Sequence, residues 1–212
     1  MDILDYKEPV TKIFFVRHGE TRANVHHLLF GHLDWDLTKD GIQQAKKAGA
    51  GLTSAQSYDY IISSPLKRAK HTAKIIANTL VKAGFKPAST ITDKNLMEKS
   101  EGSWEGKDLW QVRKEDPKNY YRWLKNPFRN KPREGESIAD LNKRVKKFHK
   151  TILKKYLGKN IIVVSHSGPI RLFILNILGS DIKKFWHLQI GCGSITEVHI
   201  SKKHAVVQSM NK

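Results

Sequence analysis

Two short apolar runs without polar alternation constrain the fold of this chain more than any other feature. Their sequences are KIFFV at residues 12–16 and NIIVV at residues 160–164. Strands covered on both faces, as in a parallel sheet between helices, have this continuous apolar character, whereas half-exposed strands alternate apolar and polar residues. A third run, YDYII at 58–62, fits the same pattern. We therefore expect a largely parallel sheet buried between helices.

Segments with helical periodicity follow these runs. After the third run, Ser64 and Pro65 suit the cap and first position of a helix, and Gly84 suits its end. A longer helix should begin after Ser137, because Asp140 three positions later completes a capping-box pattern. Strands that alternate with helices predict a layered α/β domain.

Weaker patterns complete this picture. Thr38 suits the cap of another helix, although Gly49 inside it lowers helix propensity. Residues 195–200 and 205–207 have the character of two strands joined by a short turn. We expect the parallel sheet to be finished by an antiparallel strand.

Composition indicates one domain over residues 1–212. The chain is 39% hydrophobic and 27% charged, which suits a globular domain with a full core. Residues 104–134 are rich in Trp, Tyr, Arg, Asn and Pro, fit the strand–helix periodicity poorly, and are predicted to form a lid or insertion. Cys192 is the single cysteine, and the N-terminal segment MDILDYKEPVTK lacks the features of a signal peptide, so we expect a cytoplasmic protein. The apolar runs are far shorter than the roughly 20 residues of a membrane span, so we expect no membrane partner.

The formal charge of +18 raises the question of a nucleic-acid partner, because 38 Lys and Arg face 20 Asp and Glu. Many of the lysines are paired at outer helix positions: Lys46-Lys47, Lys146-Lys147, Lys154-Lys155 and Lys183-Lys184. Such pairs are typical of a solvated helix face. Zinc-finger spacing, an RNP-like aromatic segment and an arginine-rich tail are missing from the sequence, so specific nucleic-acid binding is not expected despite the charge.

Residues with reactive or charged side chains directly follow the two central apolar runs. Arg17, His18 and Gly19 follow the first run, and Ser165, His166, Ser167 and Gly168 follow the other. The carboxyl ends of parallel strands meet at one crevice, so both imidazoles should face it together with free backbone amides. Arg68, in the first turn of the helix after the third run, should reach the same place. This set of cations and imidazoles predicts a site for a doubly charged oxyanion, most naturally phosphate.

With these residues the chain resembles the histidine phosphatase superfamily, also called phosphoglycerate-mutase-like, and in particular its small phosphatase branch. The resemblance is carried in order by Arg17 to Thr21 with Asn24, Gly31, Asp36 to Gly41 with Gln44-Ala45, Ser63 to Pro65 with Arg68-Ala69, Leu96 to Glu98 with Gly102 and Trp104 to Gly106, Gly135 to Ser137, and His166 to Gly168 with Arg171. It spans most of the chain.

The resemblance implies a three-layer α/β/α fold with a mostly parallel central sheet, no metal and no cofactor. It implies that His18 becomes phosphorylated, that Arg17, Asn24, Arg68 and His166 hold the phosphoryl group, and that Glu98 donates the proton to the leaving group. Thr21, Gly31 and Ser167 are further candidates for substrate binding. Many relatives have glycine at the position of Ser167, whose side chain either crowds the pocket or adds a donor.

Several residues have competing interpretations. Glu101, Glu105 and protonation through water are alternatives to Glu98 as acid. Asn24 also suits a loop cap, and Thr21 also suits the start of a turn. Arg171 is expected to be structural or to lie at the pocket rim. His26-His27 and His32 lie in a loop without the nearby carboxylate pair of a metal site, so they are expected either to border the substrate entrance or to have no functional role.

The functional prediction is a metal-independent phosphatase that hydrolyses a phosphate monoester of a small metabolite through a phosphohistidine intermediate. The alternatives are a phosphoglycerate mutase and a basic, non-catalytic protein that binds a phospho-ligand or nucleic acid. The partner is a small phosphorylated metabolite, for which sugar phosphates, phosphoglycerates, nucleotides and α-ribazole phosphate all remain open. The oligomeric state is predicted as monomer or homodimer.

Overall fold

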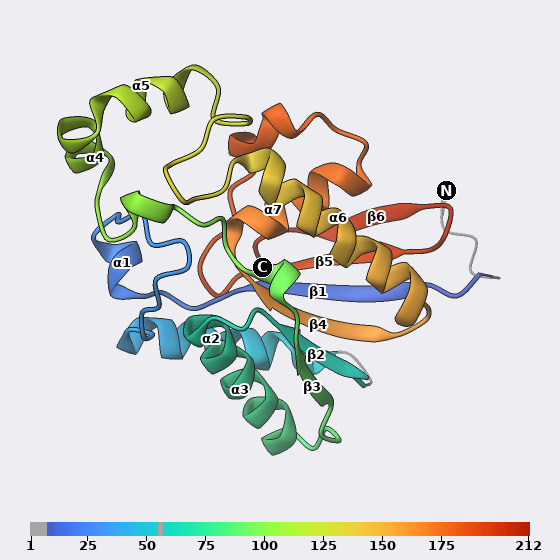
Figure 1. The fold of residues 1–212 in the computed structure, drawn as a ribbon. Helices are drawn as coiled ribbons and strands as arrows, with labels where there is room; N and C mark the ends of the chain where they lie inside the picture. Colours follow the sequence, from blue (N-terminus) through green and yellow to red (C-terminus); the bar gives the residue numbers. More distant parts are fainter. Residues whose placement is uncertain (1–7, 55–56) are drawn as a thin grey trace.

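The structure of the protein is a computed structural model that describes residues 8–54 and 57–212 (Figure 1). Residues 1–7, the beginning of the N-terminal segment considered above for a signal peptide, lie outside the described residues. The strands are β1 (Thr11–Arg17), β2 (Tyr60–Ser63), β3 (Ser89–Thr92), β4 (Asn160–Ser165), β5 (Ile195–Ile200) and β6 (Ala205–Ser209). The α-helices are α1 (Arg22–Val25), α2 (Lys39–Gly51), α3 (Lys67–Lys82), α4 (Leu109–Glu115), α5 (Pro117–Lys125), α6 (Ile138–Lys155) and α7 (Ser167–Ile177). Short 3₁₀ segments are η1 (Leu52–Ser54), η2 (Lys94–Leu96), η3 (Gly102–Trp104) and η4 (Ile182–His187).

The sheet confirms the mostly parallel topology expected from the sequence. Its six strands have the order β3-β2-β4-β1-β5-β6. The pairs β3–β2, β2–β4 and β4–β1 are parallel, whereas β5 runs antiparallel to β1 and β6 antiparallel to β5. The predicted C-terminal strand pair therefore forms the antiparallel edge of the sheet.

Helices cover both faces of the sheet, so the α/β/α layering is also confirmed. One face packs against α2 and α3, where residues such as Ala48 and Ile76 meet Ile61 and Val164. The other packs against α6 and α7, where Phe148 and Phe173 meet Phe15 and other strand residues. In Figure 1 the two helix pairs lie on opposite sides of β1 and β4. Both faces of the central strands are thus apolar, which explains their unbroken hydrophobic runs.

Most predicted helix boundaries match the structure. The hydroxyl of Thr38 caps α2, and Ser137 with Asp140 forms the capping box of α6. Gly84 follows the end of α3 with a φ of +90°, a conformation suited to glycine. Gly49 lies inside α2 where a Cβ atom would come 2.8 Å from Cβ of Thr79, so the glycine permits the close packing of α2 on α3.

The predicted start of α3 is wrong. The helix begins at Lys67 with Leu66 as its N-cap, and Ser64 and Pro65 precede it. Ser64 instead continues the pairing of β2 with β4, because its N–H donates to the carbonyl of Val164 at 2.9 Å. Strand β3 was not predicted, because all four of its residues are exposed at the sheet edge and form no apolar run.

Residues 104–134 contain the short helices α4 and α5. The indole of Trp104 is buried and donates from Nε1 to Asp116 at 3.1 Å, which anchors the segment. Its two ends meet, because the N–H of Ser103 donates to the carbonyl of Arg133 at 2.9 Å. Figure 1 shows α4 and α5 apart from the main layers, on the same side of the molecule as α1.

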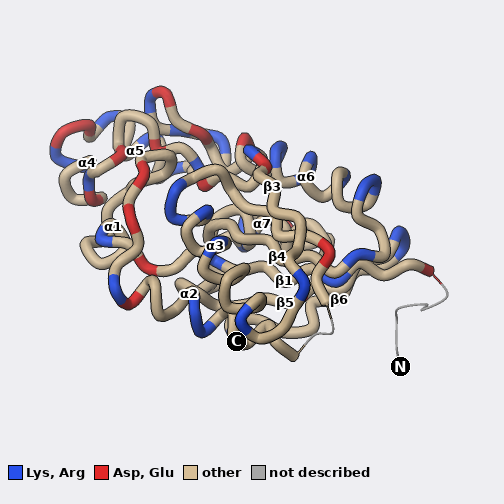
Figure 2. The backbone as a smooth tube through the Cα atoms, turned by 90° about the horizontal axis from the view of Figure 1, so that it is seen from below, with Lys and Arg blue, Asp and Glu red and all other residues tan. Residues whose placement is uncertain are grey.

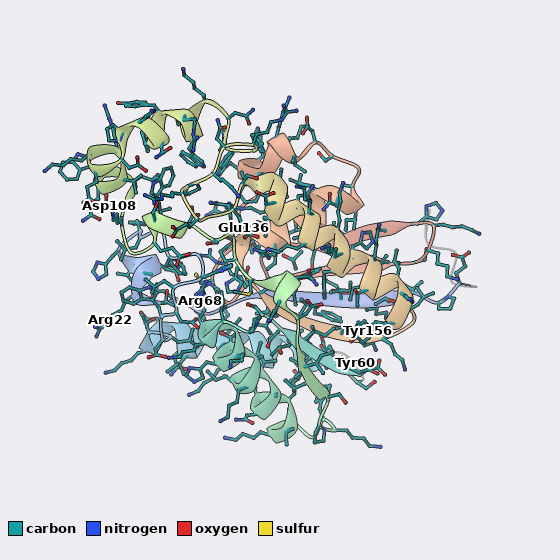
Figure 3. All side chains as sticks on the ribbon, in the orientation of Figure 1. Arg22, Tyr60, Arg68, Asp108, Glu136 and Tyr156 are labelled. Carbon is teal, nitrogen blue, oxygen red and sulfur yellow. The ribbon has the colours of Figure 1, made fainter. Side chains whose placement is uncertain are left out.

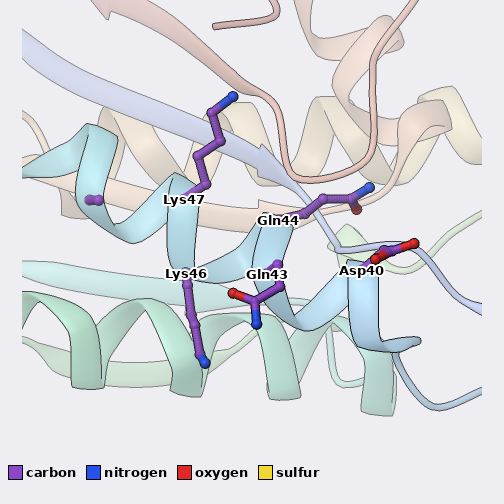
Figure 4. A pocket seen from close by; sticks show the side chains of 6 residues that line it. Asp40, Gln43, Gln44, Lys46 and Lys47 are labelled. Atoms are coloured by element: carbon purple, nitrogen blue, oxygen red, sulfur yellow. The ribbon is translucent and has the colours of Figure 1, made fainter.

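The lysine pairs of the sequence lie on the surface. Figure 2 shows basic segments along the outer side of α6, where Lys146, Lys147, Lys154 and Lys155 are exposed. A shallow hollow along α2, lined by Asp40, Gln43, Gln44, Lys46, Lys47 and Ala50, contains none of the predicted site residues (Figure 4). Within the described part of the chain, no helix has both the length and the apolar character that crossing a bilayer requires.

Candidate active site

The parallel pairing of β1 with β4 brings two histidines together. Arg17 and Ser165 are opposite each other in the register, so His18 and His166 follow the ends of adjacent strands. Their ring centroids lie 5.0 Å apart, and both side chains are buried. The site therefore lies at the carboxyl edge of the sheet, as predicted. Figure 3 shows Arg68 toward this end of the sheet and Tyr60 with Tyr156 toward the other.

His18 is held in one tautomer. Its Nδ1 lies 2.7 Å from the carbonyl oxygen of Gly19. A carbonyl oxygen only accepts hydrogen bonds, so Nδ1 carries the proton and Nε2 of the neutral ring keeps a lone pair. Burial lowers the pKa of His18 well below its ordinary value, and the positive charges of Arg68 and Arg17 lower it further. The ring is thus a neutral imidazole with a nucleophilic nitrogen at neutral pH.

His166 shares this environment. Its Nε2 lies 2.9 Å from the hydroxyl of Ser64, the residue that the sequence misassigned as a helix cap. Burial lowers the pKa of His166 well below its ordinary value. Interactions with Arg68 and then with His18 lower this pKa further. Its Nδ1 is buried and has no hydrogen-bond partner in residues 8–54 and 57–212.

Arg68 is the most deeply buried cation of the site. It projects from the first turn of α3 and is fully inaccessible to solvent. Its NH2 donates to the carbonyl of Gly31 at 2.7 Å and its NH1 to that of Leu33 at 3.1 Å, while Asp34 lies 3.5 Å from NH1. Burial lowers the pKa of Arg68 to about 10, so it remains charged at neutral pH. Carbonyls and a carboxylate thus compensate much of its desolvation.

Donors remain free at this cluster. Arg17 uses NH1 to reach the carbonyl of Ile190 at 2.6 Å. Nε of Arg17 and Nε of Arg68 are buried and, within the described residues, have no hydrogen-bond partner. Together with Nδ1 of His166, they give the site unpaired polar nitrogens beside positive charge. Buried polar groups are nearly always paired, so these free nitrogens beside positive charge are suited to an anion.

Glu98 lies at the N-terminus of α7, next to the residues after His166. Its Oε2 accepts from the hydroxyl of Ser167 at 3.3 Å and from the N–H of Gly168 at 3.2 Å. Its Oε1 accepts from the N–H of Lys99 at 2.9 Å. The carboxyl group is therefore fixed against the residues that directly follow His166. Of the two alternatives for the Ser167 side chain, which were to crowd the pocket or to add a hydrogen-bond donor, the contact with Glu98 corresponds to the added donor.

The competing carboxylates are engaged elsewhere. Glu101 pairs with the ammonium group of Lys99 at 2.5 Å, and Oε1 of Glu105 accepts the N–H groups of His32 and Glu101 at 2.8 and 3.1 Å. These contacts organise the loop around Glu98. Among the three candidates, Glu98 is the one with a carboxyl oxygen at the start of α7.

Arg144 of α6 is a site residue that the sequence did not reveal. Its Nε and NH2 donate to the two carboxylate oxygens of Glu136 at 2.9 and 2.8 Å. The same guanidinium donates to the carbonyls of Asn95, Met97 and Glu98. It thus fixes the backbone that presents the Glu98 side chain. Helical periodicity places Arg144 only near the inner face of α6 and gives no sign of these contacts.

Thr21 and Asn24 cap the short helix α1. Oδ1 of Asn24 accepts from the N–H of Thr21 at 3.0 Å and from its hydroxyl at 2.9 Å. The cap interpretation of Asn24 therefore holds, Thr21 is the N-cap of α1 rather than only the start of a turn, and the amide NH₂ of Asn24 remains available as a donor. Gly31 has a φ of +29°, and a Cβ atom there would lie 2.6 Å from the backbone nitrogen of Glu101. Its carbonyl supports Arg68.

The other predicted residues lie around this cluster. His32 donates from Nε2 to the carbonyl of Glu98 at 2.9 Å, whereas His26 and His27 are exposed. Within the described residues, no group of three or more His, Cys, Asp or Glu side chains has the arrangement of a metal site. The arrangement thus offers a neutral imidazole nucleophile, cationic donors for an oxyanion and a fixed carboxyl group.

The buried histidines should make stability depend on pH. Below the ordinary histidine pKa of 6.5, the unfolded chain binds protons that the folded site excludes, so stability present above this pH is lost as the pH falls. Each ring contributes a slope of up to about 1.4 kcal/mol per pH unit. We predict that His18→Gln, whose amide can still donate to Gly19, reduces the slope by about this amount. Urea unfolding from pH 6.5 to about pH 5 measures it. An unchanged slope would contradict a neutral, buried His18.

Comparison with known proteins agrees with this geometry. The model of the family described as histidine phosphatase superfamily (branch 1) matches residues 13–212. Phosphoserine phosphatase 1 of Hydrogenobacter thermophilus is 32% identical over 202 residues, covering 95% of this chain and 92% of that protein. Adenosylcobalamin/alpha-ribazole phosphatase of Escherichia coli is 30% identical over 94% of this chain and 95% of that protein.

Solved structures show the same relationship. The crystal structure of a putative alpha-ribazole-5'-P phosphatase from Escherichia coli superposes with a TM-score of 0.87 at 29% identity, covering 95% of this chain and 96% of that chain. The similarity thus extends over nearly the whole chain rather than over one motif. This chain belongs to the histidine phosphatase superfamily, branch 1.

Proposed function

We propose that this protein is a metal-independent phosphatase that hydrolyses a phosphate monoester of a small metabolite through a phosphohistidine at His18. The observation that carries the proposal is the buried, neutral His18 ring, whose proton is fixed on Nδ1 beside two arginines. Its relatives carry the names phosphoserine phosphatase and alpha-ribazole phosphatase, which support this reaction class. In the proposed complex, Arg17, Arg68, His166 and the amide of Asn24 hold the phosphoryl oxygens.

The first step transfers the phosphoryl group. Nε2 of His18 attacks phosphorus, the bond from phosphorus to the ester oxygen breaks, and the leaving oxygen takes the proton of the Glu98 carboxyl group. The Nδ1–H bond to Gly19 stabilises the positive charge that develops on the ring. The arginines stabilise charge on the phosphoryl oxygens, so catalysis rests mainly on preorganised electrostatics and positioning.

The second step restores the enzyme. Glu98, now a carboxylate, takes a proton from water as the water oxygen attacks phosphorus and the bond between phosphorus and Nε2 breaks. In our proposal Ser167 serves Glu98 in both states, because a hydroxyl donates to a carboxylate and accepts from a carboxylic acid. Arg144 positions Glu98 because its guanidinium donates a hydrogen bond to the backbone carbonyl of Glu98.

We further propose that the chain is a single phosphatase domain in which residues 104–134 act as a lid or insertion that contacts the leaving group. Two contacts support this. The hydrogen bond between Ser103 and Arg133 joins the two ends of the segment, so the segment forms a closed insertion in the domain. A bridge between Leu29 and Lys107 joins it to the loop that leads to Gly31.

Phosphate release tests the reaction. With EDTA present, the wild-type protein should release phosphate from p-nitrophenyl phosphate and from at least one of phosphoserine, 3-phosphoglycerate and α-ribazole 5'-phosphate. His18→Ala should reduce turnover at least about 10³-fold, because it removes the nucleophile. His71→Ala, an exposed position on α3, is the matched control and should retain activity. Activity that survives in His18→Ala, or that EDTA abolishes, would refute the proposal. Conversion of 3-phosphoglycerate to 2-phosphoglycerate with little free phosphate would identify a mutase instead.

The role of Glu98 predicts a dependence on the leaving group. A 4-nitrophenolate ion departs without protonation, whereas an alkoxide requires it, and kcat/KM reports the first phosphoryl transfer. We expect Glu98→Gln to lower kcat/KM for alkyl phosphates by roughly 10²–10⁴-fold and for p-nitrophenyl phosphate by less than about tenfold. Ser167→Ala should lower the alkyl value by about 3- to 10-fold and have no further effect in the Glu98→Gln background. Ser180→Ala, beyond the far end of α7, is the control. Equal losses for both substrates would contradict this assignment.

A further inference from the structure

Arg171 is a cation that the proposed chemistry does not use. It lies on α7 one turn after Ser167, on the same helix face, and is half-buried. Its guanidinium stacks on the buried ring of Phe185 in η4, with Cζ 5.2 Å from the ring centroid. Its Nε is buried and has no hydrogen-bond partner in the part of the chain that the structure describes.

The surroundings of Arg171 connect it to the site. Burial lowers the pKa of Arg171, the charge of Glu98 opposes this shift, and the charge of Arg17 adds to it, so the fields of both residues reach the Arg171 guanidinium. The segment from η4 to Ile190 supplies both the ring under Arg171 and the carbonyl that binds Arg17. Arg171 thus lies where α7 meets this segment, on the side of the site that Glu98 occupies.

The contrast with two other arginines, the fully buried Arg68 and the partly buried Arg144, indicates a ligand. Arg68 has Asp34 and backbone carbonyls as partners, and Arg144 has Glu136 and three carbonyls. Arg171 forms no ion pair or hydrogen bond with any described residue, and its guanidinium lies over the ring of Phe185. Partial burial of a guanidinium whose Nε has no hydrogen-bond partner is unfavourable, whereas a planar carboxylate pairs with such a group through two parallel hydrogen bonds.

We propose that Arg171 binds a carboxylate of the leaving group, so the substrate is a phosphate monoester with a carboxylate a few bonds from the ester oxygen. This inference rests on the proposed phosphatase function and specifies its substrate class. The phosphoryl group already has Arg17, Arg68 and both histidines, and Glu98 marks the side on which the alcohol departs. In this proposal the Arg171 guanidinium, on the Glu98 side of the site, therefore faces the alcohol portion of the substrate. Phosphoserine and phosphoglycerate have the required carboxylate, whereas a nucleoside-like alcohol such as α-ribazole has none.

Matched substrates test this proposal in the wild-type protein. Phosphoserine and phosphoethanolamine differ by one carboxylate, as do 3-phosphoglycerate and glycerol 3-phosphate in their terminal group. We expect kcat/KM to favour the carboxylate-bearing member of each pair by roughly 10- to 100-fold, the range for a charged hydrogen-bonded pair. Equal values within each pair, or a preference for α-ribazole 5'-phosphate over both acids, would overturn the proposal without need of a variant.

Substitution of Arg171 assigns the effect to this residue. Arg171→Gln should reduce kcat/KM for phosphoserine by roughly 10- to 100-fold while changing the values for phosphoethanolamine and p-nitrophenyl phosphate by less than about threefold. Arg171→Lys keeps the charge and should recover part of the loss. Lys154→Gln, on the exposed face of α6, is the control for lost positive charge. A uniform loss on all three substrates would show a structural role and overturn the inference.

The two proposals fail in different ways. Hydrolysis of p-nitrophenyl phosphate that depends on His18 supports the phosphatase function whatever Arg171 does. If that hydrolysis is missing, the function itself is refuted. If it is present but carboxylates bring no preference, only the substrate class is wrong.

Discussion

The parallel register between β1 and β4 is the constraint on which the rest of the site depends. It aligns the ends of two strands that are about 150 residues apart in sequence, with Arg17 opposite Ser165. The residues that leave the sheet next are His18 and His166, so one register produces the imidazole pair. Because a slip by one residue would turn each side chain to the opposite face, the buried apolar faces of both strands also protect the geometry of the site.

Burial at the carboxyl edge of the sheet determines the protonation state of His18. A histidine exposed to water is partly protonated near neutral pH, but burial beside Arg17 and Arg68 keeps His18 neutral. The arginines tolerate the same burial because carbonyls from Gly31, Leu33 and Ile190 accept their hydrogen bonds. Backbone carbonyls thus stabilise the buried positive charge, and Nε of both arginines has no hydrogen-bond partner among the described residues. Arg171 is also partly buried, but within residues 8–54 and 57–212 it has no carbonyl as a hydrogen-bond partner.

The sequence allowed prediction of those parts that local pattern determines. Unbroken apolar runs indicated β1, β2 and β4, and residues directly after such runs were expected at the sheet edge, which located His18 and His166. Arg68 followed from its place in the first turn of a helix. Ser64 shows the limit of local reasoning. Ser64 followed by Pro65 has the pattern of a helix start, but in the fold the Ser64 hydroxyl contacts His166, which follows a different strand. Arg144 was not predicted because its partners, from Asn95 to Glu98 and at Glu136, become neighbours only through the fold.

The central claim is that His18 carries the phosphoryl group during turnover. Rapid quenching of the wild-type protein and of Glu98→Gln with p-nitrophenyl phosphate, followed by peptide mass spectrometry under alkaline conditions, tests it most directly. The account predicts a phosphate on the peptide containing His18. It should be base-stable and acid-labile and should accumulate more in Glu98→Gln, where the activation of water is impaired. Turnover without any phosphorylated peptide, or with the phosphate on another residue, would contradict the account.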